Sequence, residues 1–226
     1  MPLIVAIDGP SGSGKSTLGR MLARALNLLY IDTGSMYRAV ALGVIHADVN
    51  PADEDSVTSL AERLDIDFAG DPDSLRVLLD GKDVTEQIRT ERVTEISSKV
   101  STIPGVRRAM VARQRQMGQR GAVLNGRDIG TVVFPDADYK FFLTALAKER
   151  AERRYREDLI KNPATSFADT FTEMSERDLR DSTRADSPLR VADGGIVIDS
   201  SGMSIAEVFQ FMMAQIKDQK SANEKE

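Results

Sequence analysis

The sequence predicts an α/β fold in which helices flank a parallel sheet. Short, β-branched apolar segments alternate with longer segments that are apolar at helical spacing. Parallel strands need such crossover helices, so the alternation is typical of a parallel sheet. The first apolar segment is followed by a turn with three glycines. The 226 residues are enough for one domain or slightly more, and we find no internal repeat.

The composition excludes several classes of protein. Hydrophobic residues make up 41% and charged residues 29%, as in globular proteins, and the net charge of −5 favours neither nucleic acid nor membranes. There is no cysteine, which excludes disulfides, zinc–thiolate sites and cysteine nucleophiles. No apolar run approaches the roughly 20 residues that span a bilayer, and the N-terminal run lacks a signal peptide's basic flank. We therefore expect a cytoplasmic protein.

The N-terminal part reads as two strand–helix units. Residues 3–7 predict a strand buried on both faces, and the glycine turn at 8–14 leads into a helix at 15–26. A second short strand is expected at 28–31. The next turn, which begins at Asp32, opens a helix to about His46, and we expect this histidine to be structural or solvated.

An acidic segment, about 49–89, departs from this alternation. It predicts a short helix near 54–64, then two extended runs at 65–68 and 75–79. Asp80 and Gly81 form a hairpin signal after the second run. We expect a small antiparallel insertion here.

The α/β pattern then returns. A helix is expected over 92–117, interrupted at Pro104-Gly105, and three further strands are predicted at 122–124, 139–143 and 196–198. The last three helices are predicted at 148–161, at 169–184 and from Ser204 to about Lys217. The basic stretch 148–156 is interpreted mainly as a solvated face.

Residues 9–16 match G-x-x-x-x-G-K-[ST], the P-loop pattern. Its glycines let backbone N–H groups converge on phosphate oxygens at a helix N-terminus. Lys15 suits the β- and γ-phosphates of ATP, and the Ser16 hydroxyl can ligate Mg²⁺. The alternative is a glycine-rich loop that matches the pattern by chance, but it leaves the apolar strand before the loop and the amphipathic helix after it unexplained. Asp8 either reaches Mg²⁺ through water or only fixes the loop. The predicted ATP-binding residues are Gly9, Pro10, Ser11, Gly12, Ser13, Gly14, Lys15, Ser16 and Thr17.

A kinase for small molecules also needs a second anion site, and arginines follow the predicted strands. Arg38 follows the second strand, and Arg127 and Asp128 follow the strand predicted at 122–124. Arg177, Asp181 and Arg184 stand at i, i+4 and i+7, on one face of a helix. Taken alone, Arg38 could be a surface residue and the last group a salt-bridged solvated helix.

At these residues the chain resembles the bacterial cytidylate kinase family over essentially its whole length, in the segments 7–17, 32–38, 126–136 and 177–188. The resemblance implies a fold like that of P-loop nucleoside monophosphate (NMP) kinases, with a five-stranded parallel sheet, an NMP-binding insertion and a helical lid. The implied parts are a core at about 1–48, 90–156 and 185–218, the insertion at about 49–89, the lid at about 157–184 and a disordered tail at 219–226.

The resemblance also implies roles for residues. Ser98, Arg107 and Asp128 would read cytosine, with Ser97 as an alternative to Ser98. Thr33 would help to hold the nucleotide, and Tyr37 would pack near the sugar and base. Asp181 would contact the ribose hydroxyls, with Arg177 nearby. Three arginines would grip the CMP phosphate: Arg38, Arg127 and Arg184. The residues expected to act in catalysis are Lys15, Arg127, Arg177 and Arg184.

The expected reaction is transfer of the γ-phosphoryl group of ATP to CMP or dCMP, assisted by Mg²⁺, in a monomer. The acceptor is already an ionised phosphate oxygen, so we expect no dedicated general base. The alternatives are a P-loop kinase for UMP, AMP or shikimate, a nucleotide-dependent switch without a second anion site, and a nucleic-acid-associated ATPase. The acidic charge argues against the last.

Overall fold

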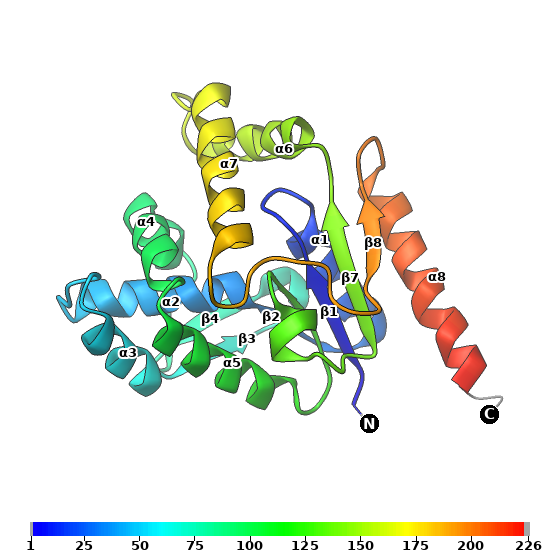
Figure 1. Ribbon diagram of the computed structural model, residues 1–226, viewed down its shortest axis with the longest axis horizontal. Helices are drawn as coiled ribbons and strands as arrows, with labels where there is room; N and C mark the ends of the chain where they lie inside the picture. Colours follow the sequence, from blue (N-terminus) through cyan, green and yellow to red (C-terminus); the bar gives the residue numbers. More distant parts are fainter. Residues whose placement is uncertain (1, 224–226) are drawn as a thin grey trace.

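A computed structural model describes residues 2–223 and contains a five-stranded parallel sheet in the order β2-β6-β1-β7-β8 (Figure 1). Its strands are β1 Ile4–Asp8, β2 Leu29–Asp32, β6 Ala122–Gly126, β7 Tyr139–Thr144 and β8 Ile196–Asp199. All four neighbouring pairs are parallel. The predicted α/β class and the five predicted strands are confirmed.

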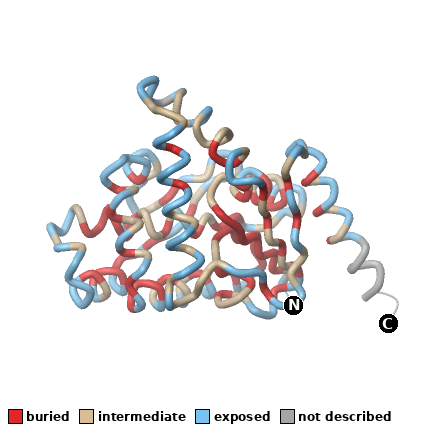
Figure 2. Tube along the Cα trace, turned by 45° about the horizontal axis from the view of Figure 1, so that its top comes forward, coloured by how far each residue is buried: buried red, intermediate tan, exposed pale blue. Residues whose placement is uncertain are grey.

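Helices cover both faces of this sheet. Helices α1 (Lys15–Leu26) and α8 (Ile205–Asn223) lie on one face, and α2 (Thr33–His46), α4 (Glu91–Val100) and α5 (Pro104–Gly118) on the other. Side chains of β1 alternate between the two resulting cores, as the period of two for a strand requires. Figure 2 shows the buried residues concentrated along the central strands.

The insertion is the expected antiparallel element. It holds α3 (Glu54–Arg63) and a sheet of β3 (Ile66–Ala69), β4 (Arg76–Leu79) and the unpredicted β5 (Lys82–Asp83), with short 3₁₀ turns at Pro72–Ser74 and Gln87–Arg89. Asp80 and Gly81 have φ values of 50° and 74°, as a tight hairpin turn requires. The apolar side chains of this insertion join the core formed with α2, α4 and α5, so it has no separate core.

Pro104 divides the predicted helix of residues 92–117 into α4 and α5, and it is the first residue of α5. Proline is favoured there because the first helical N–H has no partner within the helix. The next residue, Gly105, allows α3 and α5 to approach closely. A Cβ at Gly105 would lie 2.3 Å from Thr58 Oγ1, which is far inside contact distance.

Two further helices, α6 (Ala147–Lys161) and α7 (Phe167–Thr183), pack against each other above the sheet edge, crossing at a steep angle (Figure 1). Ser166 caps α7 by accepting the N–H of Asp169. The expected lid boundary at 156/157 falls inside α6. Helix α7 ends at Thr183, so Arg184 lies just beyond the predicted helical face, in extended backbone.

Helix α8 begins after a reciprocal cap between Ser204 and Glu207, which confirms the predicted start. It continues to Asn223, into the segment expected to be a tail, and residues 224–226 lie outside the described part. Within residues 2–223, no helix combines the length and the apolar character that a bilayer crossing requires.

The carboxyl ends of three strands meet at one edge of the main sheet. Asn125 pairs with Ile7 on one side and with Asp32 on the other, so the P-loop, the start of α2 and the segment after β6 leave the sheet together. Ligands bind at this edge in open parallel sheets.

Candidate active site

One large cavity, of about 1320 Å³, opens at this edge of the sheet. The P-loop, the start of α2, parts of the insertion, the segment after β6 and helices α4 to α7 contribute to its lining. Every predicted site residue lines it except Gly9 and Pro10. Pockets for one drug-sized ligand commonly measure 300–1,000 Å³, so this volume has room for two nucleotides.

Gly9 and Pro10 shape the P-loop instead of lining the cavity. Gly9 has φ 147°, and a Cβ there would lie 2.0 Å from the Leu143 carbonyl oxygen of β7. The Pro10 carbonyl accepts a hydrogen bond from Lys15 Nζ at 2.5 Å. The loop therefore rests on β7 and holds its lysine by its own backbone.

Lys15 is almost completely buried among cations. Burial lowers the pKa of its ammonium group well below the usual range, and the positive charges of Arg127 and Arg177 lower it further. Burial and Arg127 also lower the pKa of Arg177 to about 10. A bound polyphosphate would relieve this repulsion, which is the electrostatic character expected of an anion site.

Arg107 and Asp128 meet on the side of the cavity away from the P-loop. Arg107 Nη2 donates to Asp128 Oδ2 at 2.5 Å, and the Arg107 guanidinium lies 5.6 Å from the centre of the Tyr37 ring. Burial raises the pKa of Tyr37 to about 12, so this phenol is neutral at pH 7. Arg107 Nε and Arg184 Nη2 are buried without a hydrogen-bond partner in residues 2–223, so two donors remain for a ligand.

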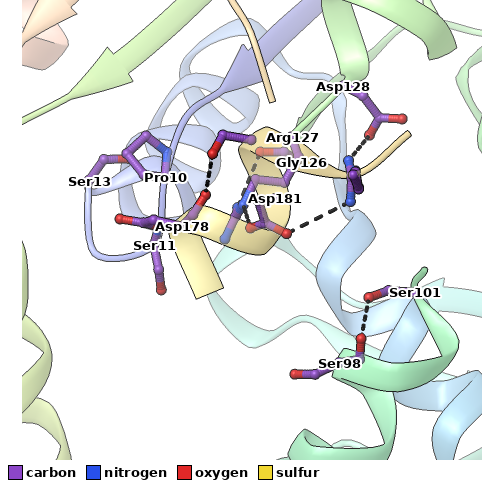
Figure 3. A network of polar contacts seen from close by, with 12 residues as sticks. Pro10, Ser11, Ser13, Ser98, Ser101, Gly126, Arg127, Asp128, Asp178 and Asp181 are labelled. Carbon is purple, nitrogen blue, oxygen red and sulfur yellow. Dashed lines mark hydrogen bonds and ion pairs between the residues drawn. The ribbon is translucent and has the colours of Figure 1, made fainter. Parts of the chain in front are cut away.

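Arg127 and Asp181 lie side by side in the lining of the cavity (Figure 3), and Arg184 lines the same cavity. Arg127 Nε donates to Asp181 Oδ2 at 2.7 Å. Arg184 reaches Asp181 at 3.8 Å and Asp128 at 3.9 Å despite lying past the end of α7. Arg38 is held by the Thr94 hydroxyl at 2.6 Å. The three arginines that the resemblance assigns to an acceptor phosphate thus line one cavity: Arg38, Arg127 and Arg184.

Both candidate serines of α4 line the cavity, so the choice between Ser97 and Ser98 stays open. Ser98 Oγ donates to the Thr94 carbonyl. Ser101 also lines the cavity, donates to the Ser98 carbonyl and accepts from Arg107 through its own carbonyl. Sequence reasoning missed Ser101, although it stands about one turn after the predicted serines, at the C-cap of the same helix.

Comparison with known proteins identifies the family. A sequence model described as "Cytidylate kinase" matches residues 5–218. The chain belongs to the cytidylate kinase family. A cytidylate kinase of Geobacter sp. (strain M21) is 44% identical over 224 residues, which cover 99% of this chain and 96% of the relative. One of Solibacter usitatus (strain Ellin6076) is 48% identical over 218 residues, covering 95% and 92%.

The fold is also found in a solved structure of an uncharacterized protein from Eubacterium ventriosum. Its TM-score is 0.52 at 10% identity, with 95% of this chain and 98% of that chain covered. At this identity the likeness concerns the fold alone.

For this cytidylate kinase family member, the expectation of a mainly solvated face at 148–156 is wrong for Arg150, which is 7% exposed and contacts the P-loop. Arg153 and Arg154, one turn further along α6, line the cavity. The spacing of three and four residues, which places all three on one helical face, could have indicated this. Charge count alone could not, because a basic helix is usually solvated.

Asp8, the last residue of β1, holds the segment that follows β6. Its two carboxylate oxygens accept the N–H groups of Ile129 and Gly130, each at 2.8 Å, at the start of a π-helical turn, Ile129–Val133. Burial raises the pKa of this carboxyl group to about 6, although both hydrogen bonds lower it. These contacts give Asp8 a structural role, but at the segment after β6 and not at the P-loop, where the sequence predicted it. The π-helical turn was not predicted.

Proposed function

We propose that this protein transfers the γ-phosphoryl group of ATP to CMP, and also to dCMP, giving ADP and the corresponding diphosphate. The observation that carries the proposal is that two anion sites of different construction face one cavity. The first is the P-loop with Lys15, and the second is the arginine group of Arg38, Arg127 and Arg184. Membership in the cytidylate kinase family supports the acceptor's identity.

The acceptor base is assigned to the Arg107–Asp128 pair. Cytosine differs from uracil mainly at position 4, where an amine replaces a carbonyl, and the Asp128 carboxylate can accept from that amine and repel the carbonyl. Arg107 can donate to the cytosine O2 and N3 acceptors. Since both side chains are buried, a wrong base leaves a polar group unpaired, and that is how such pockets discriminate strongly.

The donor base is assigned to the opposite end of the cavity. Arg153, Met203 and Ile205 line the cavity there, with Ile205 about 3.4 Å from where a Cβ of Gly14 would stand. Arg153 is fixed by two contacts with Ser200, so its guanidinium is available as a stacking surface for a purine.

Mg²⁺ is expected with ATP, and the residues present fit it. Ser16 lines the cavity, and its hydroxyl oxygen is oriented by Asn125 Nδ2 at 3.2 Å. No group of three or more acidic or histidine side chains that could hold a metal occurs in residues 2–223, which agrees with an ion held mainly by phosphates, water and one hydroxyl. When bound, the ion neutralises charge on the β- and γ-phosphates.

The protein's part in the transfer is to position and to neutralise. Lys15, Arg127, Arg177 and Arg184 are the proposed catalytic cations, and an arginine in such a site is worth about 10³-fold or more in rate. Asp181 contacts the ribose hydroxyls while it holds Arg127. The segment of about 157–184 acts as the lid that excludes water over ATP, and about 49–89 closes over the acceptor.

A coupled assay of ADP release with a panel of monophosphates tests this function. CMP and dCMP should stimulate ADP release strongly, and UMP, AMP and shikimate weakly. Equal activity with UMP would refute the cytosine assignment. Absence of stimulation by every acceptor would favour a switch protein. We further propose a monomer in the cytoplasm, which light scattering and cell fractionation check.

A further inference from the structure

The apex of the P-loop is held by two charged side chains that the proposed reaction does not use. Arg150 Nη1 donates to the Ser11 carbonyl at 2.9 Å and lies 2.6 Å from Asp178 Oδ2. Asp178 Oδ1 in turn accepts the Ser11 N–H at 3.3 Å. Both backbone polar groups of Ser11 are therefore bound by one ion pair, and Figure 3 shows Asp178 beside Ser11.

This ion pair is itself anchored. Arg150 Nε donates to the Ala145 carbonyl at 3.0 Å, at the junction between β7 and α6, and its side chain is 8% exposed. Gly12 packs against both α6 and α7, because a Cβ at Gly12 would lie 2.7 Å from the Arg150 carbonyl oxygen and 3.0 Å from Met174 Cε. The loop apex thus fits between α6 and α7, with no room for a side chain at Gly12.

The contact also fixes the rotation of α7 about its axis. Asp178 directly follows Arg177, so the two side chains point about 100° apart, and Asp181 stands one turn after Arg177. With Asp178 bound to Ser11, Arg177 and Asp181 face the cavity beside Lys15 and Arg127. Releasing Asp178 frees α7 to turn or lift, which moves Arg177 and Asp181 together.

We propose that Arg150 and Asp178 form a clamp that positions the P-loop apex and the lid helix relative to each other. Both are positioning residues, since they act through Ser11 and Arg177 and not on the reacting atoms. The inference rests on the proposed kinase function for its kinetic part only. The clamp contacts Ser11 of the P-loop, so its loss affects ATP and leaves cytosine recognition by Arg107 and Asp128 intact.

The test compares Asp178→Asn and Arg150→Gln with Glu176→Gln, a control on the same helix whose exposed side chain lies 3.9 Å from Arg180. Asp178→Asn keeps the side-chain shape but loses the ion pair, and its partly exposed position makes it the safer variant for folding. Loss of a charge-assisted contact corresponds to roughly a 10-fold to 100-fold effect.

We expect both clamp variants to raise the KM for ATP and lower kcat by about tenfold each. The KM for CMP should rise less, because Asp181 and Arg127 are disturbed while Arg107 and Asp128 stay in place. The preference for CMP over UMP should stay unchanged. The double variant should be no worse than the poorer single variant, because the two residues act as one unit. Without nucleotide, amide hydrogen exchange at residues 9–14 should accelerate in both clamp variants and stay unchanged in Glu176→Gln.

Several outcomes would overturn the clamp. These are a lowered melting temperature with unchanged kinetics and exchange, an equal rise of both KM values, and strictly additive effects of the two substitutions. If the unsubstituted protein fails to phosphorylate CMP, the proposed function is refuted but the clamp is not. ATP binding by calorimetry and the exchange at residues 9–14 then still decide whether the clamp holds the loop.

Discussion

Arg107 Nη2 lies 2.5 Å from Asp128 Oδ2, in a contact between two side chains that are almost completely buried. The residues assigned to the cytosine edge are thus already paired with each other. The pair keeps an ionised carboxylate in the interior, where an unpaired charge would be costly. It also orients Asp128 before the base arrives, so that little reorganisation is needed on binding.

Asp128→Asn should lower kcat/KM for CMP by about 10²-fold, because the neutral amide no longer accepts strongly from the cytosine amine and no longer pairs with Arg107. The KM for ATP should change less than about threefold. Steady-state kinetics with CMP and UMP measure this. Asp186→Asn is the matched control, since Asp186 lies 3.9 Å from Arg107 Nε but is much more exposed. An unchanged preference for CMP over UMP in Asp128→Asn would contradict the assignment.

Lys15→Met should lower kcat at least about a hundredfold, because the charge that faces the transferred phosphate is lost. The melting temperature of the nucleotide-free variant should be equal or higher, since burial and the charges of Arg127 and Arg177 already disfavour a charged Lys15. Scanning fluorimetry with and without ATP measures both effects. A melting temperature several degrees lower would show that Lys15 stabilises the fold.

Asp8 should make stability depend on pH. Its pKa is about 6 in the folded protein against 3.8 for an ordinary aspartate, so between these pH values the folded state binds more protons than the unfolded state. Stability from this group is full below pH 4 and is lost as the pH rises through about 6, by up to about 3 kcal/mol. Urea unfolding at pH 4.5 and pH 7 measures it. The unsubstituted protein should lose free energy of unfolding relative to Asp8→Asn between pH 4.5 and pH 7, because the amide does not ionise. An equal difference in free energy at the two pH values would refute the raised pKa.

Gly105→Ala should destabilise the protein by about 1–3 kcal/mol, because the new methyl group collides with Thr58 where α3 meets α5. In an open helix the same change would stabilise by up to about 1 kcal/mol. Thr58→Ala removes the two nearest atoms and should restore part of the loss in the double variant. Additive free energies of unfolding, measured in urea, would show that the contact is not the cause.

Much of the fold could be predicted because each strand of the main sheet is a short apolar run between clear helix and turn signals. Val5 and Ile7 face one core while Ile4 and Ala6 face the other, so the whole run is apolar. The P-loop could be predicted equally well, since its backbone geometry requires glycine at fixed positions.

The remaining features depend on contacts between distant segments. Arg150 and Asp178 look like ordinary charges of surface helices, and only the packing of α6 and α7 brings them to Ser11. The π-helical turn after β6 depends on Asp8, more than a hundred residues earlier in the chain. Arg184 lies past the end of α7, so helical spacing alone did not predict how it reaches Asp181.

The close succession of Arg177, Asp178 and Asp181 on α7 has a consequence for which length changes the chain can tolerate. One residue inserted between Ser166 and Arg177 without breaking the helix would rotate all three side chains by about 100°, away from both the loop and the cavity. The same insertion in the connection at 162–166 would leave their phase unchanged. Variation in length among working versions of this sequence should therefore gather in that connection and avoid the helix.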